Sequence, residues 1–280
     1  MMENSYIPTL SEKEVSNAIS TLGVKKSNER VWQVMLLGIL AGLYIGFGGQ
    51  LFLVTVAGGM GKVAGGIMFS AGLILVVIAG AELFTGNVTL LIGVLSAVIP
   101  RRKMFKNWVL VYIGNFIGSL ALAWLIFQTG LLGSSEALNK VGTVSVSVAE
   151  AKLAIPFTQA LLRGVFCNIL VILAIIMAVM AKDIISKIFC IIFPISCFVA
   201  CGFEHCVANM FLIPLGLLAK GVPLYETFVS FRNLVPVTIG NIIGGVFILV
   251  IHPNRIRQIR IILQKEHPVI HRELREKEGE

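Results

Sequence analysis

The sequence is dominated by long apolar stretches separated by a few short polar segments. Hydrophobic residues make up 56% of the 280 residues, charged residues only 14%, and the mean hydropathy is +0.89. A soluble domain of this length needs more charge to cover its surface. The composition therefore predicts an all-α integral membrane protein, because a helix satisfies its own backbone hydrogen bonds within lipid.

The lengths of the apolar segments indicate how many times the chain crosses the bilayer. A helix needs about 20 apolar residues to span the hydrocarbon core. Two segments are shorter, and each follows a polar interruption, at 82–87 and at 204–205. We therefore expect six transmembrane helices, of which the second and the fifth are broken. The segments are 31–57, 63–81, 88–99, 108–131, 153–180, 188–202, 206–218 and 228–251.

Basic residues predict the orientation of these passes. They occur around 25–30, 101–106, 182–187 and 255–265, and six passes place all four groups on one side, together with both termini. The positive-inside rule makes this side the cytoplasm, so the net charge of +8 indicates topology and not a nucleic-acid surface. The stretch 133–150 is expected to be an outer loop that lies along the membrane surface. All five cysteines fall in apolar stretches, so neither a disulfide framework nor a metal site is expected.

The predicted domains follow from this topology. Residues 1–30 form a polar cytoplasmic segment without a cleavable signal peptide, helical from Ser11. Residues 31–252 form the transmembrane channel domain, with repeats at about 31–131 and 152–252. Residues 253–280 form a cytoplasmic tail, expected to be a solvated helix.

Two short motifs recur in the same order in both halves of the chain. The pattern G-x-E-x4-N occurs at 80–87 and 202–209, 122 residues apart, and I-G-N-x-I-G occurs at 113–118 and 239–244, 126 residues apart. Each half contains three passes, so the second half enters the membrane from the opposite side. The pattern indicates two inverted three-helix repeats, an architecture of channels and transporters with sites near the bilayer midplane.

The polar residues at the breaks predict a path through the bilayer. Ionisable side chains at this depth are costly unless they face a pore or one another, and unwound backbone is tolerated only inside protein or beside a cavity. Half-helix N-termini favour an anion, and Thr85, Asn87 and His205 can donate hydrogen bonds to one. Carboxylates would repel an anion, so we expect the glutamates to point away and hold the broken backbone. The break-support residues are Glu82, Glu204, Asn87 and Asn209.

Other functions remain open at this point. A proton-coupled symporter of a short-chain carboxylate needs the same pore and titratable group as a channel. A neutral-solute pore is less favoured, because the twin N-P-A motifs are absent. An intramembrane enzyme is also less favoured, because the chain has no H-E-x-x-H or G-x-S-x-G. No cofactor and no metal are predicted.

The segments A-G-A-E-L-F-T-G-N at 79–87, G-F-E-H-C-V-A-N-M-F at 202–211 and N-L-V-P-V-T-I-G-N-I-I-G-G at 233–245 resemble the signature segments of the formate–nitrite transporter family. The resemblance covers about residues 10–252. It implies an aquaporin-like fold and a homopentamer in which every protomer has its own pore and membrane lipid plugs the central axis. It also implies transport of formate, nitrite, hydrosulfide or a related monovalent anion, in the bacterial inner (cytoplasmic) membrane and without enzymatic activity.

The resemblance also assigns roles to individual residues. The substrate pore is expected to contain Thr85, His205, Lys152, Asn168 and Asn241. The hydrophobic constrictions are expected to contain Phe69, Leu73, Leu83, Phe84 and Phe198. We hypothesise that Lys152 attracts the anion, which takes a proton and crosses as the neutral acid. In this scheme His205 is the proton donor or charge sensor, and Thr85 and Asn168 hold the substrate.

Overall fold

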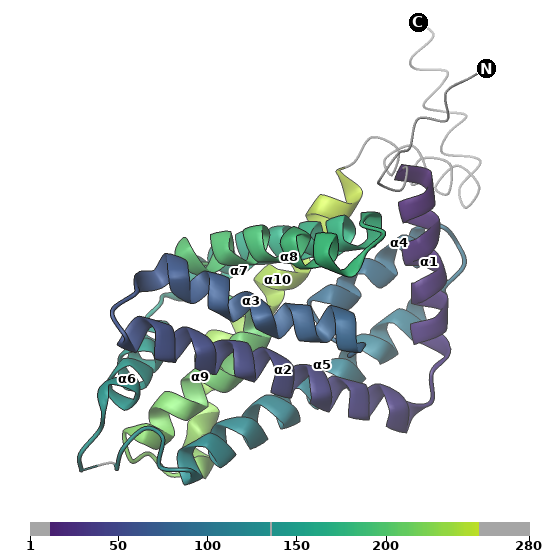
Figure 1. Cartoon of the computed structure of the whole chain (residues 1–280). Helices are drawn as coiled ribbons and strands as arrows, with labels where there is room; N and C mark the ends of the chain where they lie inside the picture. Colours follow the sequence, from purple (N-terminus) through teal and green to yellow (C-terminus); the bar gives the residue numbers. More distant parts are fainter. Residues whose placement is uncertain (1–11, 135, 252–280) are drawn as a thin grey trace, which may run out of the picture.

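The computed structural model describes residues 12–134 and 136–251, and every regular element in these ranges is a helix (Figure 1). The only β pairing that they contain is an isolated bridge between Gly133 and Leu138. The helices are α1 (Glu12–Asn28), α2 (Val31–Ala57), α3 (Gly61–Ala79), η1 (Gly86–Thr89), α4 (Leu90–Leu95), α5 (Arg101–Gln128), α6 (Lys140–Leu153), α7 (Phe157–Met180), α8 (Ile184–Ala200), α9 (Cys206–Ala219), η2 (Leu224–Ser230) and α10 (Phe231–Val250).

Five of the described helical segments are long and apolar enough to cross a membrane. They correspond to α2, α3, α5, α7 and the continuous run of η2 and α10. Both predicted interruptions are present, because α3 ends at Ala79 before η1 and α4, and α8 ends at Ala200 before α9. The predicted break positions are therefore confirmed.

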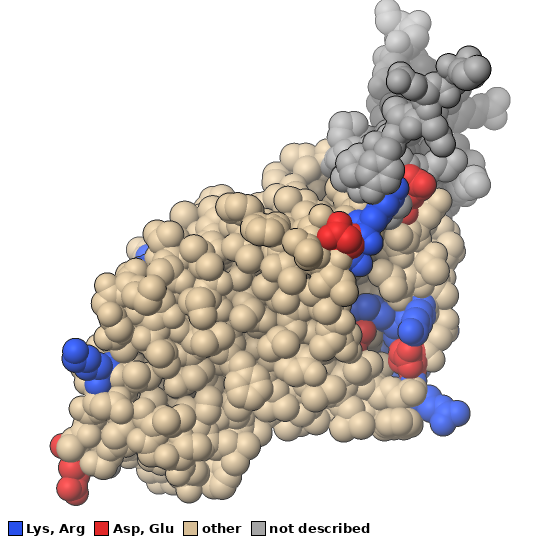
Figure 2. All heavy atoms as spheres, in the orientation of Figure 1, with Lys and Arg blue, Asp and Glu red and all other residues tan. Residues whose placement is uncertain are grey.

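The surface of the helix bundle is apolar between two charged ends. On the face drawn in Figure 2, the acidic and basic side chains of the described residues gather at the two ends. Large hydrophobic side chains such as Leu40, Phe47, Ile113 and Phe193 are exposed along the helices between these ends. An apolar surface of this extent matches a lipid environment and not water.

Small residues allow the long helices to pack closely. Gly38 of α2 faces Gly114 of α5, and Gly164 of α7 faces Gly240 of α10. A Cβ atom at Gly164 would lie 2.7 Å from the Val237 carbonyl oxygen, so only glycine fits there without movement of the backbone. Van der Waals contact between closely approaching backbones is the main source of helix association in a membrane. The two pairs are 126 residues apart, which places the same contact in each half of the chain.

Only the first part of the stretch 133–150 is a loop, because residues 140–153 form α6. Asn139 caps this helix by accepting hydrogen bonds from the Val141 and Gly142 amides. The alternating serines satisfy their hydroxyls inside the helix, as when Ser145 donates to the Val141 carbonyl. Gly142, Ser145 and Ala149 are buried, which is helical spacing hidden within a Val/Ser alternation.

Helix α6 also changes the location of Lys152. The sequence places Lys152 at the start of the fourth long segment, but it lies in the last turn of α6, and α7 begins only after Pro156. Helix α1 begins at Glu12, which agrees with the helix predicted from Ser11. Helices α1 and α6 lie at opposite ends of the bundle (Figure 1). The helix expected from residue 253 lies outside the described residues.

Candidate functional site: two cavities and the polar centre between them

A buried asparagine supports the backbone at each break. Asn115 of α5 donates to the Gly38 and Glu82 carbonyls and accepts from the Phe84 amide. In the other half, Asn241 donates to the carbonyl oxygens of Gly164 and Glu204, at 2.8 and 2.9 Å, and accepts from the amide of Cys206. An asparagine suits this position because its amide offers two donors and an acceptor in a fixed geometry. The side chain of Asn241, which was expected in the pore, therefore forms its three hydrogen bonds with backbone groups.

The glutamate at each break belongs to a second arrangement of hydrogen bonds that is repeated in the two halves of the chain. The Asn209 amide donates to Glu204 at 2.6 Å and to Asn233 at 2.7 Å. Lys152 Nζ lies 2.9 and 3.0 Å from the two carboxylate oxygens of Glu204, so this ion pair is bidentate. Glu204 is thereby surrounded by donors, which compensates for the burial of its charge.

The first half repeats this cluster with one difference. The Asn87 amide donates to Glu82 and to Asn107. Lys26 of α1 lies 3.1 Å from Glu82, but it also donates to the Asn87 side-chain oxygen at 2.9 Å. Lys26 and Lys152 are 126 residues apart, so α1 and α6 contribute equivalent lysines to the two breaks.

Two cavities approach the breaks. One, of about 180 Å³, is lined by Lys152, Glu204 and His205, and we refer to it as the Lys152 cavity. The other, of about 370 Å³, is lined by Lys26, Glu82 and Leu83, among others, and we refer to it as the Lys26 cavity. Most lining residues of one cavity have a counterpart 122 or 126 residues away that lines the other. The two cavities are thus related by the same internal repeat as the breaks.

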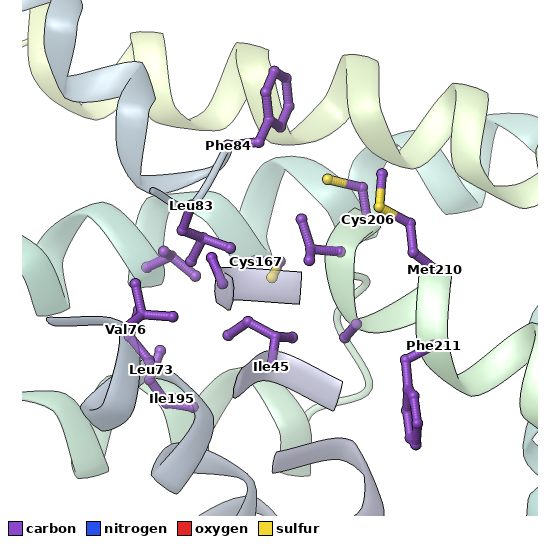
Figure 3. Close-up of a cluster of buried hydrophobic side chains, with 14 of the residues drawn as sticks. Ile45, Leu73, Val76, Leu83, Phe84, Cys167, Ile195, Cys206, Met210 and Phe211 are labelled. Carbon is purple, nitrogen blue, oxygen red and sulfur yellow. The ribbon is translucent and has the colours of Figure 1, made fainter. Parts of the chain in front are cut away.

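The predicted constriction residues separate into three places. Phe69 and Phe198 both line the Lys152 cavity, and their rings meet edge to face with centroids 5.7 Å apart. Leu73 and Leu83 both line the Lys26 cavity. Phe84 lines neither of these cavities: in Figure 3 it points away from its neighbour Leu83. Its ring packs edge-on against Tyr112, with centroids 4.9 Å apart, and also against Trp108.

The polar centre lies where the two breaks meet. Thr85 Oγ1 and His205 Nε2 are 2.9 Å apart, and both residues are buried. His205 Nδ1 accepts a hydrogen bond from the Ala208 amide and so caps α9. Nδ1 is therefore unprotonated, and Nε2 carries the proton of the neutral ring. This arrangement makes Nε2 the donor to Thr85 and leaves the Thr85 hydroxyl proton available for another acceptor.

Asn168 completes the centre with an acceptor that has no partner. Its amide nitrogen donates to the Asn241 carbonyl at 2.6 Å and to the Thr85 carbonyl at 3.3 Å. Both partners are acceptors, which fixes the orientation of the amide group. Its Oδ1 is buried and accepts no hydrogen bond from any described residue. Most buried polar atoms find a partner, so a lone acceptor at this position calls for an explanation.

Sequence reasoning overlooked several residues of these networks. Lys26, Asn107, Asn115 and Asn233 all bond at the breaks. Asn115 and Asn241 occupy the same place in the repeated I-G-N-x-I-G motif, and this signal could have identified Asn115. The 126-residue spacing would likewise have paired Lys26 with Lys152.

Comparisons with known proteins agree with this architecture. A family profile described as Formate/nitrite transporter matches residues 13–253. A probable formate transporter of Methanothermobacter thermautotrophicus is 37% identical over 255 residues, covering 84% of this chain and 92% of that protein. The formate channel FocA of Escherichia coli is 34% identical over 246 residues, with 80% and 86% coverage.

Solved structures are similar as well. A pentameric formate channel with formate bound has a TM-score of 0.67 at 34% identity and covers 78% of this chain and 94% of that chain. An ion channel of the FNT family has a TM-score of 0.74 at 29% identity, with 84% and 96% coverage. The similarity therefore extends over most of the described helices.

Proposed function

Because the chain belongs to the formate/nitrite transporter family, we propose that it is a membrane channel for small monovalent anions of weak acids, with formate as the first candidate. Nitrite and hydrosulfide belong to the same class. The relatives named as formate channels and the pentameric structure support this substrate and a homopentamer. Two cavities within a single chain support one pore in each protomer. Residues 31–252 form the channel domain of this proposal.

The proposed pore joins the Lys152 cavity to the Lys26 cavity through the polar centre. In this proposal α3 with α4, and α8 with α9, each count as one broken pass, which makes six passes in two inverted halves. The matching hydrogen bonds of Asn115 and Asn241 support this pairing. The basic end that contains Lys25 and Arg101 faces the cytoplasm, together with both termini. Phe69 with Phe198, and Leu73 with Leu83, narrow the pore on either side of the centre.

The lone acceptor of Asn168 carries the proposal for the species that crosses. A charge entering these apolar constrictions costs many kcal/mol. A neutral acid has one hydrogen-bond donor and one acceptor, which complement the Asn168 oxygen and the Thr85 hydroxyl. A carboxylate or chloride ion has no proton to offer to Asn168. We therefore assign the neutral acid to the centre, and the anion to the cavities.

The geometry of His205 refines its proposed role. Protonation at Nδ1 requires loss of the hydrogen bond that caps α9. His205 thus serves as an Nε2–H donor that orients the Thr85 hydroxyl, and the anion takes its proton from hydronium in the cavity to give the neutral acid and water. Protonation of the substrate is still linked to His205, because the Thr85 hydroxyl that His205 orients binds the neutral acid.

The test is anion flux into proteoliposomes across a pH series, with the membrane potential set by a potassium gradient and ionophore. We expect formate, nitrite and hydrosulfide to enter faster as external pH falls, without dependence on potential, and chloride to be excluded. Potential-driven formate current would overturn the neutral-acid assignment. His205→Asn and Thr85→Val should each reduce flux at least tenfold while the protein folds normally. Unchanged flux and pH dependence in His205→Asn would remove the histidine from the mechanism, and protein-free liposomes measure leakage of the acid.

A further inference from the structure

The ammonium group of Lys152 is already occupied in the Lys152 cavity. Both carboxylate oxygens of Glu204 lie within 3.0 Å of Nζ, and the two side chains are only 15% and 5% exposed. An ion pair of this kind has little net charge at a distance, because its two charges cancel. An arriving anion would have to compete with Glu204 for Lys152. The attraction of an anion to this cavity therefore requires another cation.

Arg163 of α7 is the cation that meets this requirement. It lines the Lys152 cavity and is half-buried. Within residues 12–134 and 136–251, its guanidinium forms no hydrogen bond and no ion pair. Among the described residues that line this cavity, Glu204 is the only acidic one, and it is paired with Lys152. Arg163 therefore contributes an uncompensated positive charge.

The backbone around Arg163 places it close to the pore centre. Its carbonyl oxygen accepts the Glu204 amide at 3.2 Å, so the residue lies directly beside the second break. Five residues along α7 lies Asn168, a rise of about 7.5 Å in a helix. Lys62 also lines this cavity and has no partner among the described residues. It is exposed at the first turn of α3, whereas Arg163 is half-buried.

The internal repeat shows that the backbone contact at this position does not require a charged side chain. The counterpart of Arg163 is Leu37, 126 residues earlier, whose carbonyl accepts the Glu82 amide at 3.2 Å in the same way. Leu37 also lines the equivalent cavity. The backbone hydrogen bond therefore forms whether the residue is arginine or leucine. Only the second half has a guanidinium at this position.

We propose that Arg163 is a specificity-determining residue that binds planar oxyanions in the Lys152 cavity before they reach the polar centre. A guanidinium presents parallel N–H donors that match the two oxygens of a formate or nitrite ion, whereas an ammonium acts as a point charge. The site thus favours planar, bidentate anions over hydrosulfide and halide ions. This inference rests on the proposed function, because it concerns entry to the same pore.

The test compares Arg163→Gln and Arg163→Lys with the wild type, and Lys62→Gln is the matched rim control. Formate and hydrosulfide fluxes are measured over a concentration series, at low and at high ionic strength. Focusing of anions by charge in a cavity raises local concentration by roughly tenfold or more. We therefore expect Arg163→Gln to raise the half-saturating formate concentration about tenfold at low salt, with the maximal flux within about twofold of wild type.

Two further readouts separate binding from a structural effect. In Arg163→Lys, hydrosulfide entry should be near that of the wild type, but the half-saturating formate concentration should remain raised. Lysine keeps the positive charge and lacks the parallel N–H donors of the guanidinium. High salt should raise the half-saturating formate concentration of the wild type much more than that of Arg163→Gln. Lys62→Gln should change the half-saturating concentrations of formate and hydrosulfide by less than twofold.

Several results would overturn the proposal. One is a half-saturating formate concentration in Arg163→Gln within twofold of wild type at low salt. Another is equal weakening of formate and hydrosulfide in Arg163→Lys. If Arg163→Gln does not fold, Arg163→Lys still tests the oxyanion preference. A wild-type protein without formate flux above that of protein-free liposomes refutes the proposed function itself, whereas normal wild-type flux with an unaffected Arg163→Gln refutes only the role of Arg163.

Discussion

Replacement of Lys152 by methionine tests whether the buried ion pair holds the second break together. Methionine keeps most of the length and the apolar stem of lysine but removes the charge. Glu204 would then keep the hydrogen bond from Asn209, and its buried charge would lose its ion-pair partner. Breaking a buried pair by removing one partner costs about 3–5 kcal/mol, because the remaining charge is uncompensated.

The chain contains a matched exposed ion pair between Glu150 of α6 and Lys220 at the end of α9. Lys220 lies 2.7 Å from Glu150, with the two side chains 54% and 50% exposed. An exposed pair of this kind contributes about 0–1 kcal/mol. We therefore expect Lys152→Met to lower the thermal midpoint of the detergent-solubilised protein by roughly ten degrees, and Lys220→Met by at most about three.

The double variant Lys152→Met with Glu204→Gln completes the test. Glutamine keeps an acceptor for Asn209 and removes the orphaned charge, so the double variant should recover most of the lost stability. The thermal midpoint is measured by intrinsic fluorescence for Lys152→Met, Glu204→Gln, the double variant and Lys220→Met. If Lys152→Met loses no more stability than Lys220→Met, water reaches Glu204 and the ion pair does not hold the break.

Four other substitutions test the fold. Asn241→Ala removes the side-chain hydrogen bonds of three buried backbone groups, and each group left unsatisfied costs about 1–3 kcal/mol, so monodisperse protein should be almost lost in size-exclusion chromatography, as in Asn115→Ala. Gly244→Val brings a Cβ atom against the Val165 carbonyl and should lower the thermal midpoint more than any exposed Gly→Val change; an unchanged midpoint would contradict the close packing of α7 and α10. The Asp183 carboxylate caps α8, and its backbone hydrogen bonds lower its pKa, so its contribution is complete above about pH 4 and is lost as pH falls through the lowered pKa. Asp183→Ala should therefore lower the midpoint at pH 7, and this difference should disappear in acid.

The breaks could be predicted from the sequence because they violate the local pattern. A glutamate within an apolar helix is costly, so its presence indicates either a break or a polar path. The repeated spacing E-x4-N has a direct structural cause, since each asparagine donates to the glutamate five residues before it. The observed breaks lie where the pattern predicts them.

The pairing of the charges could not be predicted in the same way. Lys152 and Glu204 are far apart in sequence, and nothing local indicates that α6 packs beside the second break. The helix at 140–153 was missed for a similar reason, because the Val/Ser alternation does not indicate a helix, although the serine hydroxyls bond within one. The inward position of Lys152 depends on that helix.

The internal repeat distinguishes scaffold from function. Residues shared by the two halves, such as the glutamate and the asparagines at each break, form equivalent hydrogen bonds, and each glutamate pairs with an equivalent lysine, so these residues build the architecture. Function should reside where equivalent positions differ. Thr85 corresponds to Val207 and His205 to Leu83, each 122 residues apart, and the polar member of each pair is bonded to the other. Each half thus contributes one partner of the Thr85–His205 hydrogen bond, and the equivalent position in the other half is apolar. A channel with two identical halves would have either two such hydrogen bonds or none, so the departure from symmetry produces a single polar binding position between apolar walls.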